Sequence, residues 1–418
     1  MKKFSKILAI FLALALVLGF AACGGKGEPT DTPTAAPADE TTAADANAAY
    51  ANIKIGLICL HDENSTYDNN FIKAFKEVQA ELGLADSQVM IKTNIAEDDA
   101  CYTAAAELAE EGCNIIFADS FGHETYILQA AKEFTDVQFC HATGTHAHTE
   151  NVPNFHNAFA SIYEGRFLAG VAAGMKLNEM IDKGDITAEQ AKIGYVGAFP
   201  YAEVKSGYTS FFLGARYICP SATMEVTFTN SWFDIALERE AALKLINDGC
   251  VLISQHADSE GAPKACEEKG VPDVSYNIDT ASIAPNTALI SSRINWAPYY
   301  KLAIDAVVKG EAIPADWTGT IATGSVELLK LNETVAAEGT QAKLDEIMNR
   351  FETGDLHVFD TATFTVKGET LTTYLADVDD DGTFTGETEA VADGYFHESE
   401  FRSAPYFDID IDGITILG

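Results

Sequence analysis

The sequence predicts an α/β protein with two doubly wound lobes, each built on a parallel sheet, which are joined by multiple hinge crossings. Short apolar runs rich in β-branched residues alternate with amphipathic helical patterns, as in repeated strand–helix–strand units. The alternation occurs in two separate series, one starting near residue 53 and the other at residue 191. Residues 51–418 also exceed the length that one hydrophobic core ordinarily serves, which favours two lobes.

The first series places a helical pattern after each strand-like run. Its first strand is "IKIGLICL" (53–60), and the helix that follows has one apolar face and a stop signal at Gly83. The remaining strands and helices of this series are expected at 88–93, 98–112, 113–119, 124–134 and 137–142. Repeated units of this kind predict a parallel sheet that helices cover on both faces.

The second series repeats this organisation. It begins with the strand "AKIGYVGAF" (191–199). Its later helices and strands are expected at 203–217, 224–230, 234–249, 250–257 and 262–270. The sequence therefore predicts a second doubly wound lobe.

The segments between and after the two series are expected to cross between the lobes. "FHNAFASIYEGRFLAGVAAGMKLN" (155–178) is a strand followed by a helix whose small residues, such as Gly170 and Gly174, permit close helix packing. The strand and helix in 288–310 are placed back in the first lobe. The chain then crosses between the lobes several times, and multiple hinge strands are typical of a clamshell that opens and closes. The expected division is 51–158 plus 278–310 for lobe 1, and 159–277 plus 311–418, with an acidic hairpin, for lobe 2.

The N-terminus has the pattern of a lipoprotein signal. A basic start, "MKKFSK", precedes the apolar run "ILAIFLALALVLGF", and small residues precede Cys23. The run is shorter than the roughly 20 residues that a membrane-spanning helix needs. We expect a signal peptide at 1–22, a lipidated Cys23, and a tether over 23–50 that is rich in Gly, Pro, Thr and Ala.

Charge and cysteine content exclude several classes of protein. Lys and Arg total 27 against 63 Asp and Glu, a net charge of −36, so nucleic acid is not an expected partner. Seven cysteines remain besides Cys23, at irregular spacings and mostly in apolar runs. We therefore expect neither a disulfide framework nor a zinc knuckle.

The loops that follow the strands are the expected binding region, because ligands of open α/β sheets bind beyond the carboxyl ends of the strands. Aromatic, carboxylate and amide side chains gather in these loops. They are "HDENSTYD" (61–68), "SFGHE" (120–124), "AFPYAE" (198–203), "TNSWFD" (229–234), "QHADS" (255–259) and "NIDT" (277–280).

Several of these segments together resemble the basic membrane protein family. They are "ENSTYDNNFIKAF", "ATG", "IYEGRFLAGVAAG", "IGYVGAFPYAEV", "NSWFD", "QHADS" and "NWAPYY", and the resemblance extends from about residue 52 to the C-terminus. It implies a type I periplasmic-binding-protein fold and a lipid-anchored, monomeric solute-binding protein of an ABC importer. The implied ligand is a purine nucleoside or nucleobase, held between the lobes and passed to a membrane permease.

The resemblance also implies site residues. Tyr67 and Trp232 are expected to sandwich a purine ring, Asp68 to accept from the ring edge, and Phe121 and Phe199 to wall the pocket. The Gly122 turn allows Ser120 and Phe121 to approach the ligand, while His123 starts the next helix. Asp258, Asn277 and Asp279 offer acceptors for sugar hydroxyl groups. Relatives with an ending like "NWAPYY" lack the lysine that nucleoside binders carry at this strand, and Arg293 and Asn295 stand nearby in this chain. Nucleobase and nucleoside remain open, and another small solute such as a sugar is the alternative ligand.

Catalysis and cofactors are not expected. The histidines of "HATGTHAHTE" (141–150) lack a recognised metal-ligand spacing, so this segment is interpreted as a polar loop at the rim. Neither a GxSxG elbow nor a P-loop is present. "DVDDDGTFTGETE" (377–389) resembles a calcium loop, but its twelfth residue is Thr388 instead of Glu, so a β-hairpin with an acidic turn is favoured.

Overall fold

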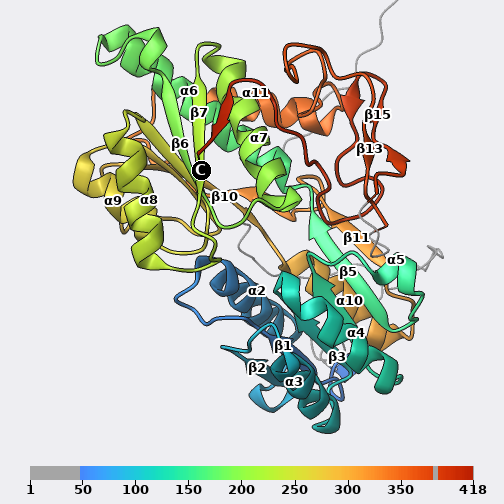
Figure 1. Ribbon diagram of the computed structural model, residues 1–418. Coiled ribbons are helices and arrows are strands. Elements are labelled where there is room, and N and C mark those ends of the chain that lie inside the picture. Colours follow the sequence, from blue (N-terminus) through green and yellow to red (C-terminus); the bar gives the residue numbers. More distant parts are fainter. Residues whose placement is uncertain (1–47, 380–384, 418) are drawn as a thin grey trace, which may run out of the picture. The chain divides into compact units, whose positions relative to one another are not determined.

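A computed structural model of the protein describes residues 48–379 and 385–417 (Figure 1). The expected signal peptide, Cys23 and nearly all of the tether lie outside the described residues. Within the described part of the chain, no helix is both long enough and apolar enough to cross a membrane.

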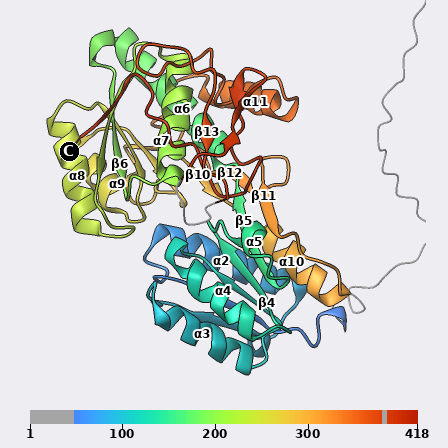
Figure 2. The same cartoon turned by 45° about the vertical axis from the view of Figure 1, so that its right-hand side comes forward.

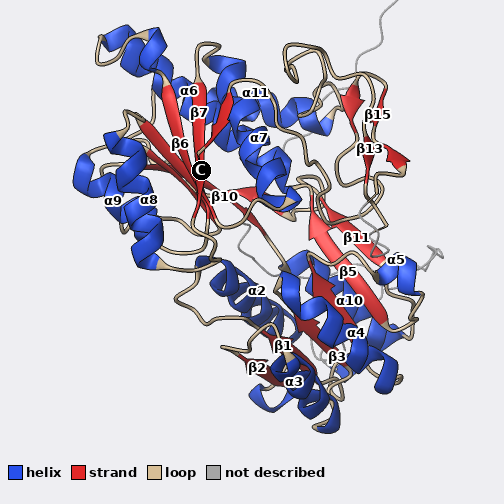
Figure 3. Ribbon diagram, in the orientation of Figure 1, coloured by secondary structure: helices blue, strands red, loops and turns tan. Residues whose placement is uncertain are grey.

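The first sheet has six parallel strands in the order β11-β5-β4-β3-β1-β2. Its strands are β1 (Ile55–Ile58), β2 (Val89–Lys92), β3 (Ile115–Ala118), β4 (Gln138–Ala142), β5 (Phe155–Ala160) and β11 (Asp316–Gly319). The associated helices are α2 (Thr66–Leu82), α3 (Asp99–Glu110), α4 (Glu124–Glu133), α5 (Ala147–Glu150) and α10 (Ala297–Lys309). Figure 3 shows helices flanking the strands of this sheet.

Alternate residues of the central strands face different cores. Ile115 and Phe117 of β3 belong to a core shared with α2 and α10, whereas Ile116 belongs to a core shared with α3 and α4. This alternation arises because successive side chains of a strand point to opposite faces of the sheet. The expected covering by helices on both faces is therefore confirmed, and α3 and α4 lie side by side in Figure 2.

The second sheet has seven strands in the order β12-β10-β9-β8-β6-β7-β17, and only β12 runs antiparallel to its neighbour. Its strands are β6 (Lys192–Gly197), β7 (Thr223–Phe228), β8 (Leu252–His256), β9 (Asp273–Tyr276), β10 (Ala288–Ile294), β12 (Val326–Leu328) and β17 (Ile414–Ile416). The associated helices are α6 (Ile162–Lys183), α7 (Ala202–Ile218), α8 (Ile235–Asn247), α9 (Gly261–Lys269) and α11 (Thr340–Glu352). The structure thus has the predicted fold class, with two doubly wound parallel-sheet lobes.

Helices α6 and α7 pack backbone against backbone, as the small residues predict. A Cβ atom built on Gly170 would lie 2.0 Å from the carbonyl oxygen of Phe211, and one on Gly214 would lie 2.0 Å from that of Phe167. Glycine is therefore required at both contacts. The chain leaves the first sheet at β5, passes through α6 and enters the second sheet at β6, so this segment is a crossing between the lobes.

Two strands lie in different sheets from those expected. Strand β10, placed by the sequence in lobe 1 (278–310), pairs with β9 of the second sheet. Strand β11, placed in lobe 2 (311–418), pairs with β5 of the first sheet. Helix α10 between them packs against α2 of the first lobe, so the chain crosses between the lobes on either side of α10.

The C-terminal segment, described over residues 353–379 and 385–417, packs beside the second lobe (Figure 1). It contains two short antiparallel pairs, β13 (Leu375–Ala376) with β14 (Thr388–Glu389) and β15 (Val391–Ala392) with β16 (Tyr395–Phe396). The first pair joins residues on either side of the expected acidic turn, and that turn itself stays a prediction. Carboxylates of Asp377, Asp379 and Glu387 lie within 4.8 Å of one another near its base, while Asp381 and Gly382 fall outside the described residues.

Candidate functional site

A small cavity of about 20 Å³ lies between the two lobes. Its walls come from loops at the carboxyl ends of strands in both sheets. They are lined by Leu60, His61, Tyr67, Asp68, Ser120, Phe121, Thr143, Glu203, Trp232, His256 and Asp258. The cavity therefore occupies the position where ligands of open α/β sheets bind.

The lobes touch each other around this cavity. The backbone N–H of Thr66 donates a 2.8 Å hydrogen bond to the carbonyl oxygen of Asp258 in the other lobe. The rings of His61 and Phe233 lie 5.4 Å apart across the same boundary, and those of Phe121 and Tyr201 lie 5.6 Å apart. The structure is therefore that of a closed cleft.

Tyr67 and Trp232, the two residues expected to sandwich a ring, line the cavity from opposite lobes. The hydroxyl of Tyr67 donates to the carbonyl oxygen of Asp119 at 2.7 Å, and its ring packs 4.8 Å from Phe71. Trp232 meets Phe199 edge to face at 5.1 Å, and its carbonyl oxygen accepts from the N–H of Asp258. Both rings are held in place by the protein itself, which leaves them preorganised as walls of the cavity.

Asp68 is largely engaged by its own loop. Its carboxylate accepts from the backbone N–H of His61 at 2.7 Å and from the hydroxyl of Ser65 at 2.5 Å. Burial alone would raise the pKa of Asp68, but the hydrogen bonds from His61 and Ser65 outweigh it and lower the pKa. Asp68 therefore lines the cavity as an anion whose oxygens already fix the 61–65 loop.

Asp119 lies behind Asp68, and its pKa is shifted in the opposite direction. It is fully buried, and its Oδ1 accepts from the N–H of Leu60 at 3.1 Å. Burial, followed by repulsion from Asp68, raises the pKa of Asp119 well above its usual range. Carboxylate oxygens of Asp68 and Asp119 lie within 4.8 Å of each other, so the negative charge of Asp68 favours the protonated form of Asp119.

The "SFGHE" turn forms the lip of the cavity. The Ser120 hydroxyl and the Gly122 N–H both donate to Glu97, at 2.6 and 2.8 Å. A Cβ atom on Gly122 would lie only 2.6 Å from the Glu97 side chain, so glycine permits this close approach. Phe121 lines the cavity yet keeps 43% of its surface exposed, while His123 is buried at the start of α4.

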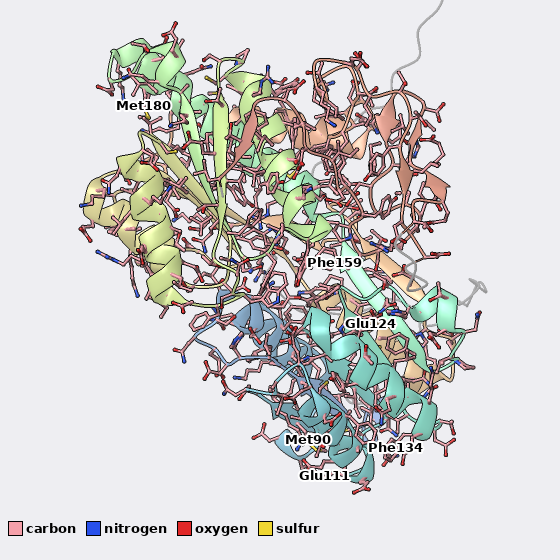
Figure 4. The ribbon with its side chains drawn as sticks, in the orientation of Figure 1. Met90, Glu111, Glu124, Phe134, Phe159 and Met180 are labelled. Carbon is pink, nitrogen blue, oxygen red and sulfur yellow. The ribbon has the colours of Figure 1, made fainter. Side chains whose placement is uncertain are left out.

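Glu124 ties the histidine loop to this lip. Its Oε1 accepts from the N–H groups of Thr145 and His146 and from the Asn157 amide, at 2.7, 2.9 and 3.0 Å. Its Oε2 lies 2.8 Å from Nδ1 of His146. Burial opposes ionisation of Glu124, but these contacts prevail and lower its pKa to about 2. The hydrogen bonds from Thr145 and His146 join Glu124, labelled in Figure 4, at the start of α4 to the segment that follows β4.

The histidines of this region are engaged in contacts with the protein. The Nε2 atom of His141 lies 2.7 Å from the carbonyl oxygen of Ser120, and that of His123 lies 2.9 Å from the carbonyl oxygen of Ile95. Burial lowers the pKa of both histidines, that of His123 to about 4. His123 and His141 therefore act as structural links within the protein.

On the side of the second lobe, the cavity is bounded by a buried polar group. Nε2 of His256 lies 3.4 Å from a Glu203 oxygen, and burial followed by repulsion from Arg166 lowers the His256 pKa to about 4. Arg166 itself is buried, with its guanidinium carbon 3.4 Å from the centre of the Tyr276 ring and one N–H donated to Gln255. Asp258 completes this wall, and burial followed by repulsion from Glu238 raises its pKa well above its usual range.

Four residues of the expected site do not line the cavity. Phe199 packs behind Trp232 and stacks on Tyr201 at 5.2 Å. Asn277 is buried with a φ of 70° and donates its N–H to Ser292, whereas Asp279 is exposed and accepts from the N–H of Ala281. Asn295 donates to Glu327, as does Arg293, the other residue considered at this strand.

Sequence reasoning did not assign five of the lining residues. They are Leu60, His61, Thr143, Glu203 and His256. All but Leu60 stand in segments that were already singled out, namely the strand-end loops and the "ATG" segment. Their position after a parallel strand was therefore a usable signal, but their side-chain types suggested no particular contact with a ligand.

Comparison with known proteins identifies the family. A family model described as ABC transporter substrate-binding protein PnrA-like (Bmp) matches residues 60–352. The chain belongs to this family. The resemblance to basic membrane proteins noted in the sequence is thereby confirmed, and the protein is a substrate-binding protein of the ABC-transporter type.

Individual relatives within and around the Bmp family differ in the ligand that their names give. A purine-binding protein of Brucella abortus is 32% identical over 321 residues, covering 75% of this chain and 85% of the relative. A putative ABC transporter glucose-binding protein of Haloferax volcanii is 33% identical over 232 residues, covering 56% of each chain. A solved solute-binding protein of an ABC transporter from Aeropyrum pernix superposes with a TM-score of 0.63 at 14% identity, over 73% of this chain and 93% of its own.

Proposed function

We propose that the protein is a lipid-anchored, non-catalytic receptor that closes on a purine nucleoside or nucleobase and presents it to the permease of an ABC importer. The observation that carries the proposal is the position of Tyr67 and Trp232, which line one cavity from opposite lobes. A purine has two π-faces and an edge of donors and acceptors, so it needs an aromatic wall on each side and short polar groups around it.

The polar groups of the cavity suit such a ligand. Asp68 accepts hydrogen bonds only, since it remains ionised, whereas the raised pKa of Asp258 favours a protonated carboxyl that can also donate. Ser120 and Thr143 add hydroxyl groups that donate and accept. This mixed set matches the mixed edge of a purine, and the name of the Brucella abortus relative points to the same ligand class.

Attachment to the membrane is part of the proposal. The N-terminal pattern ends at Cys23, and a diacylated cysteine there would hold the folded lobes at the extracytoplasmic face through the tether. Such placement is what a substrate-binding protein of an ABC importer requires, because it must meet the ligand outside the cell and the permease at the membrane. We propose a monomer without metal or cofactor.

A sugar is the second candidate ligand. The name of the Haloferax volcanii relative favours it, although that match covers only 56% of each chain. Carboxylates and aromatic rings also recognise sugars, so the walls alone do not separate the two ligand classes.

Calorimetric titration with adenine, adenosine, guanosine and inosine, beside ribose and glucose, separates the candidates. Replacing Trp232 by Ala removes one stacking partner and should cost about 1–3 kcal/mol, or roughly tenfold to a hundredfold in Kd. Phe401→Ala is the control, because this exposed aromatic residue does not line the cavity. Binding of a sugar but no purine, or unchanged purine affinity in both Tyr67→Ala and Trp232→Ala, would show that the proposal is wrong.

A further inference from the structure

A second and larger cavity adjoins the first. It has a volume of about 420 Å³, against about 20 Å³ for the inter-lobe cavity, and both cavities are lined by Phe121, Thr143 and Glu203. A ligand held between Tyr67 and Trp232 can therefore extend past these three residues without leaving the protein surface.

Most of the wall of this second cavity comes from outside the family match. The match ends at residue 352, whereas the wall includes residues of the C-terminal segment 353–417. These residues are Tyr374, Leu375, Asp377, Gly386, Arg402, Ala404, Pro405, Tyr406 and Asp408. The cavity is thus a product of sequence that the family model does not describe.

The C-terminal wall is fixed to both lobes. The N–H of Ser403 donates to Asp316 of β11 at 2.8 Å, which attaches it to the first sheet. Lys205 of α7 pairs with Asp408 at 2.6 Å, and β17 extends the second sheet beside β7. The wall is therefore an ordered part of the fold and not a loosely placed tail.

The chemistry of the second cavity suits a neutral, hydroxyl-bearing group. Glu203, Asp377 and Asp408 contribute carboxylates, Arg402 lies among them, and Lys205 is shared between Asp408 and Asp410, so negative charge remains in excess. This excess disfavours an anionic group, whereas carboxylates and backbone carbonyl groups can accept from hydroxyls.

Aromatic surface is available beside these polar groups. Phe121 and Tyr201 keep 43% and 44% of their surfaces exposed, and Tyr201 is braced from behind by Phe199. Exposed rings at the mouth of a cavity supply flat apolar faces against which the C–H groups of a sugar can pack.

We propose that the described residues of the C-terminal segment, 353–379 and 385–417, build a second ligand subsite, which holds the glycosyl group or another hydroxyl-rich substituent of a ligand whose flat ring lies between Tyr67 and Trp232. This inference rests on the proposed function, since it requires the ring to occupy the first cavity. It assigns the part of the ligand beyond the ring to the C-terminal segment instead of to Asn277 and Asp279, which do not line either cavity.

Substitutions at Leu375 test the subsite. Leu375 is 56% exposed and lines only the second cavity, so Leu375→Trp should fill that space without disturbing the core, and Leu375→Ala is the matched control. We expect Leu375→Trp to weaken adenosine binding at least about tenfold in Kd while adenine affinity changes less than about threefold. Retained adenine binding also shows that the variant is folded.

The outcomes separate this inference from the proposed function. Adenosine affinity that is unchanged in Leu375→Trp, or adenine and adenosine affinities that fall equally, would overturn the subsite and leave the receptor function intact. Wild-type protein that binds adenine but not adenosine would also overturn it. Absence of any purine binding by wild-type protein would instead refute the proposed function, and the subsite with it.

Discussion

Replacement of Glu124 tests how the lip of the cavity is held. In the wild-type protein one buried carboxylate accepts from Thr145, His146 and Asn157, and thereby links α4 to the segment that follows β4. Glu124→Ala leaves these donors without their acceptor. Because each buried unsatisfied polar group costs about 1–3 kcal/mol, the free energy of unfolding should fall by roughly 3–5 kcal/mol at pH 7.

The loss of unfolding free energy in Glu124→Ala should also depend on pH. The folded-state pKa of Glu124 is about 2, below the ordinary glutamate value of 4.5, so the carboxylate contributes stability above pH 4.5 that is lost as the pH falls towards 2. A difference of 2.5 pKa units corresponds to about 3.4 kcal/mol, of which about 2 kcal/mol is lost between pH 7 and pH 3. The difference in unfolding free energy between wild-type protein and Glu124→Ala should therefore be about 2 kcal/mol smaller at pH 3 than at pH 7.

Urea unfolding at pH 7 and pH 3 measures both effects. Glu150→Gln serves as the control, because Glu150 forms an exposed ion pair with Lys132 and such pairs contribute at most about 1 kcal/mol. A loss below about 1 kcal/mol at pH 7 in Glu124→Ala, or a gap that does not narrow at pH 3, would refute the reasoning.

Three further predictions concern packing, titration and anchoring. Gly214→Ala should lower the free energy of unfolding by at least about 1–3 kcal/mol in urea titrations, because its Cβ would collide with the Phe167 carbonyl oxygen. Burial raises the Asp273 pKa to about 7, so the folded state binds more protons than the unfolded state; wild-type stability should fall by about 2–3 kcal/mol more than that of Asp273→Asn between pH 5 and pH 8. Cys23→Ala should release the protein from membranes on fractionation, and retention would contradict the lipid anchor.

The fold class was predictable because buried parallel strands and amphipathic helices leave a periodic pattern in the sequence. By contrast, the sequence did not predict to which of the two sheets a crossing strand belongs. Strand β10 is almost wholly buried in either placement, and its apolar run has no feature that identifies its hydrogen-bonding neighbour β9. Strand β11 is short and partly exposed, so its pairing with β5 depends on tertiary contacts that no local pattern records.

The candidate site was predictable to the level of loops. Tyr67, Trp232 and Asp258 follow parallel strands of two sheets, and the geometry of such sheets brings those loops to one cleft. The hydrogen-bonding state of each side chain was not predictable, because it depends on neighbours that are distant in the sequence. Asp119 and Glu97 illustrate this, since neither was assigned a role although each fixes a residue of the cavity wall.

Native mass spectrometry of the purified full chain tests the central claim most directly, because a closed cleft retains its ligand through purification when the affinity is high. The proposal predicts a bound species with the mass of a purine nucleobase or nucleoside, which is lost from Trp232→Ala and restored to wild-type protein by added adenosine or adenine. A bound hexose or pentose in wild-type protein, with no purine taken up on addition, would contradict it.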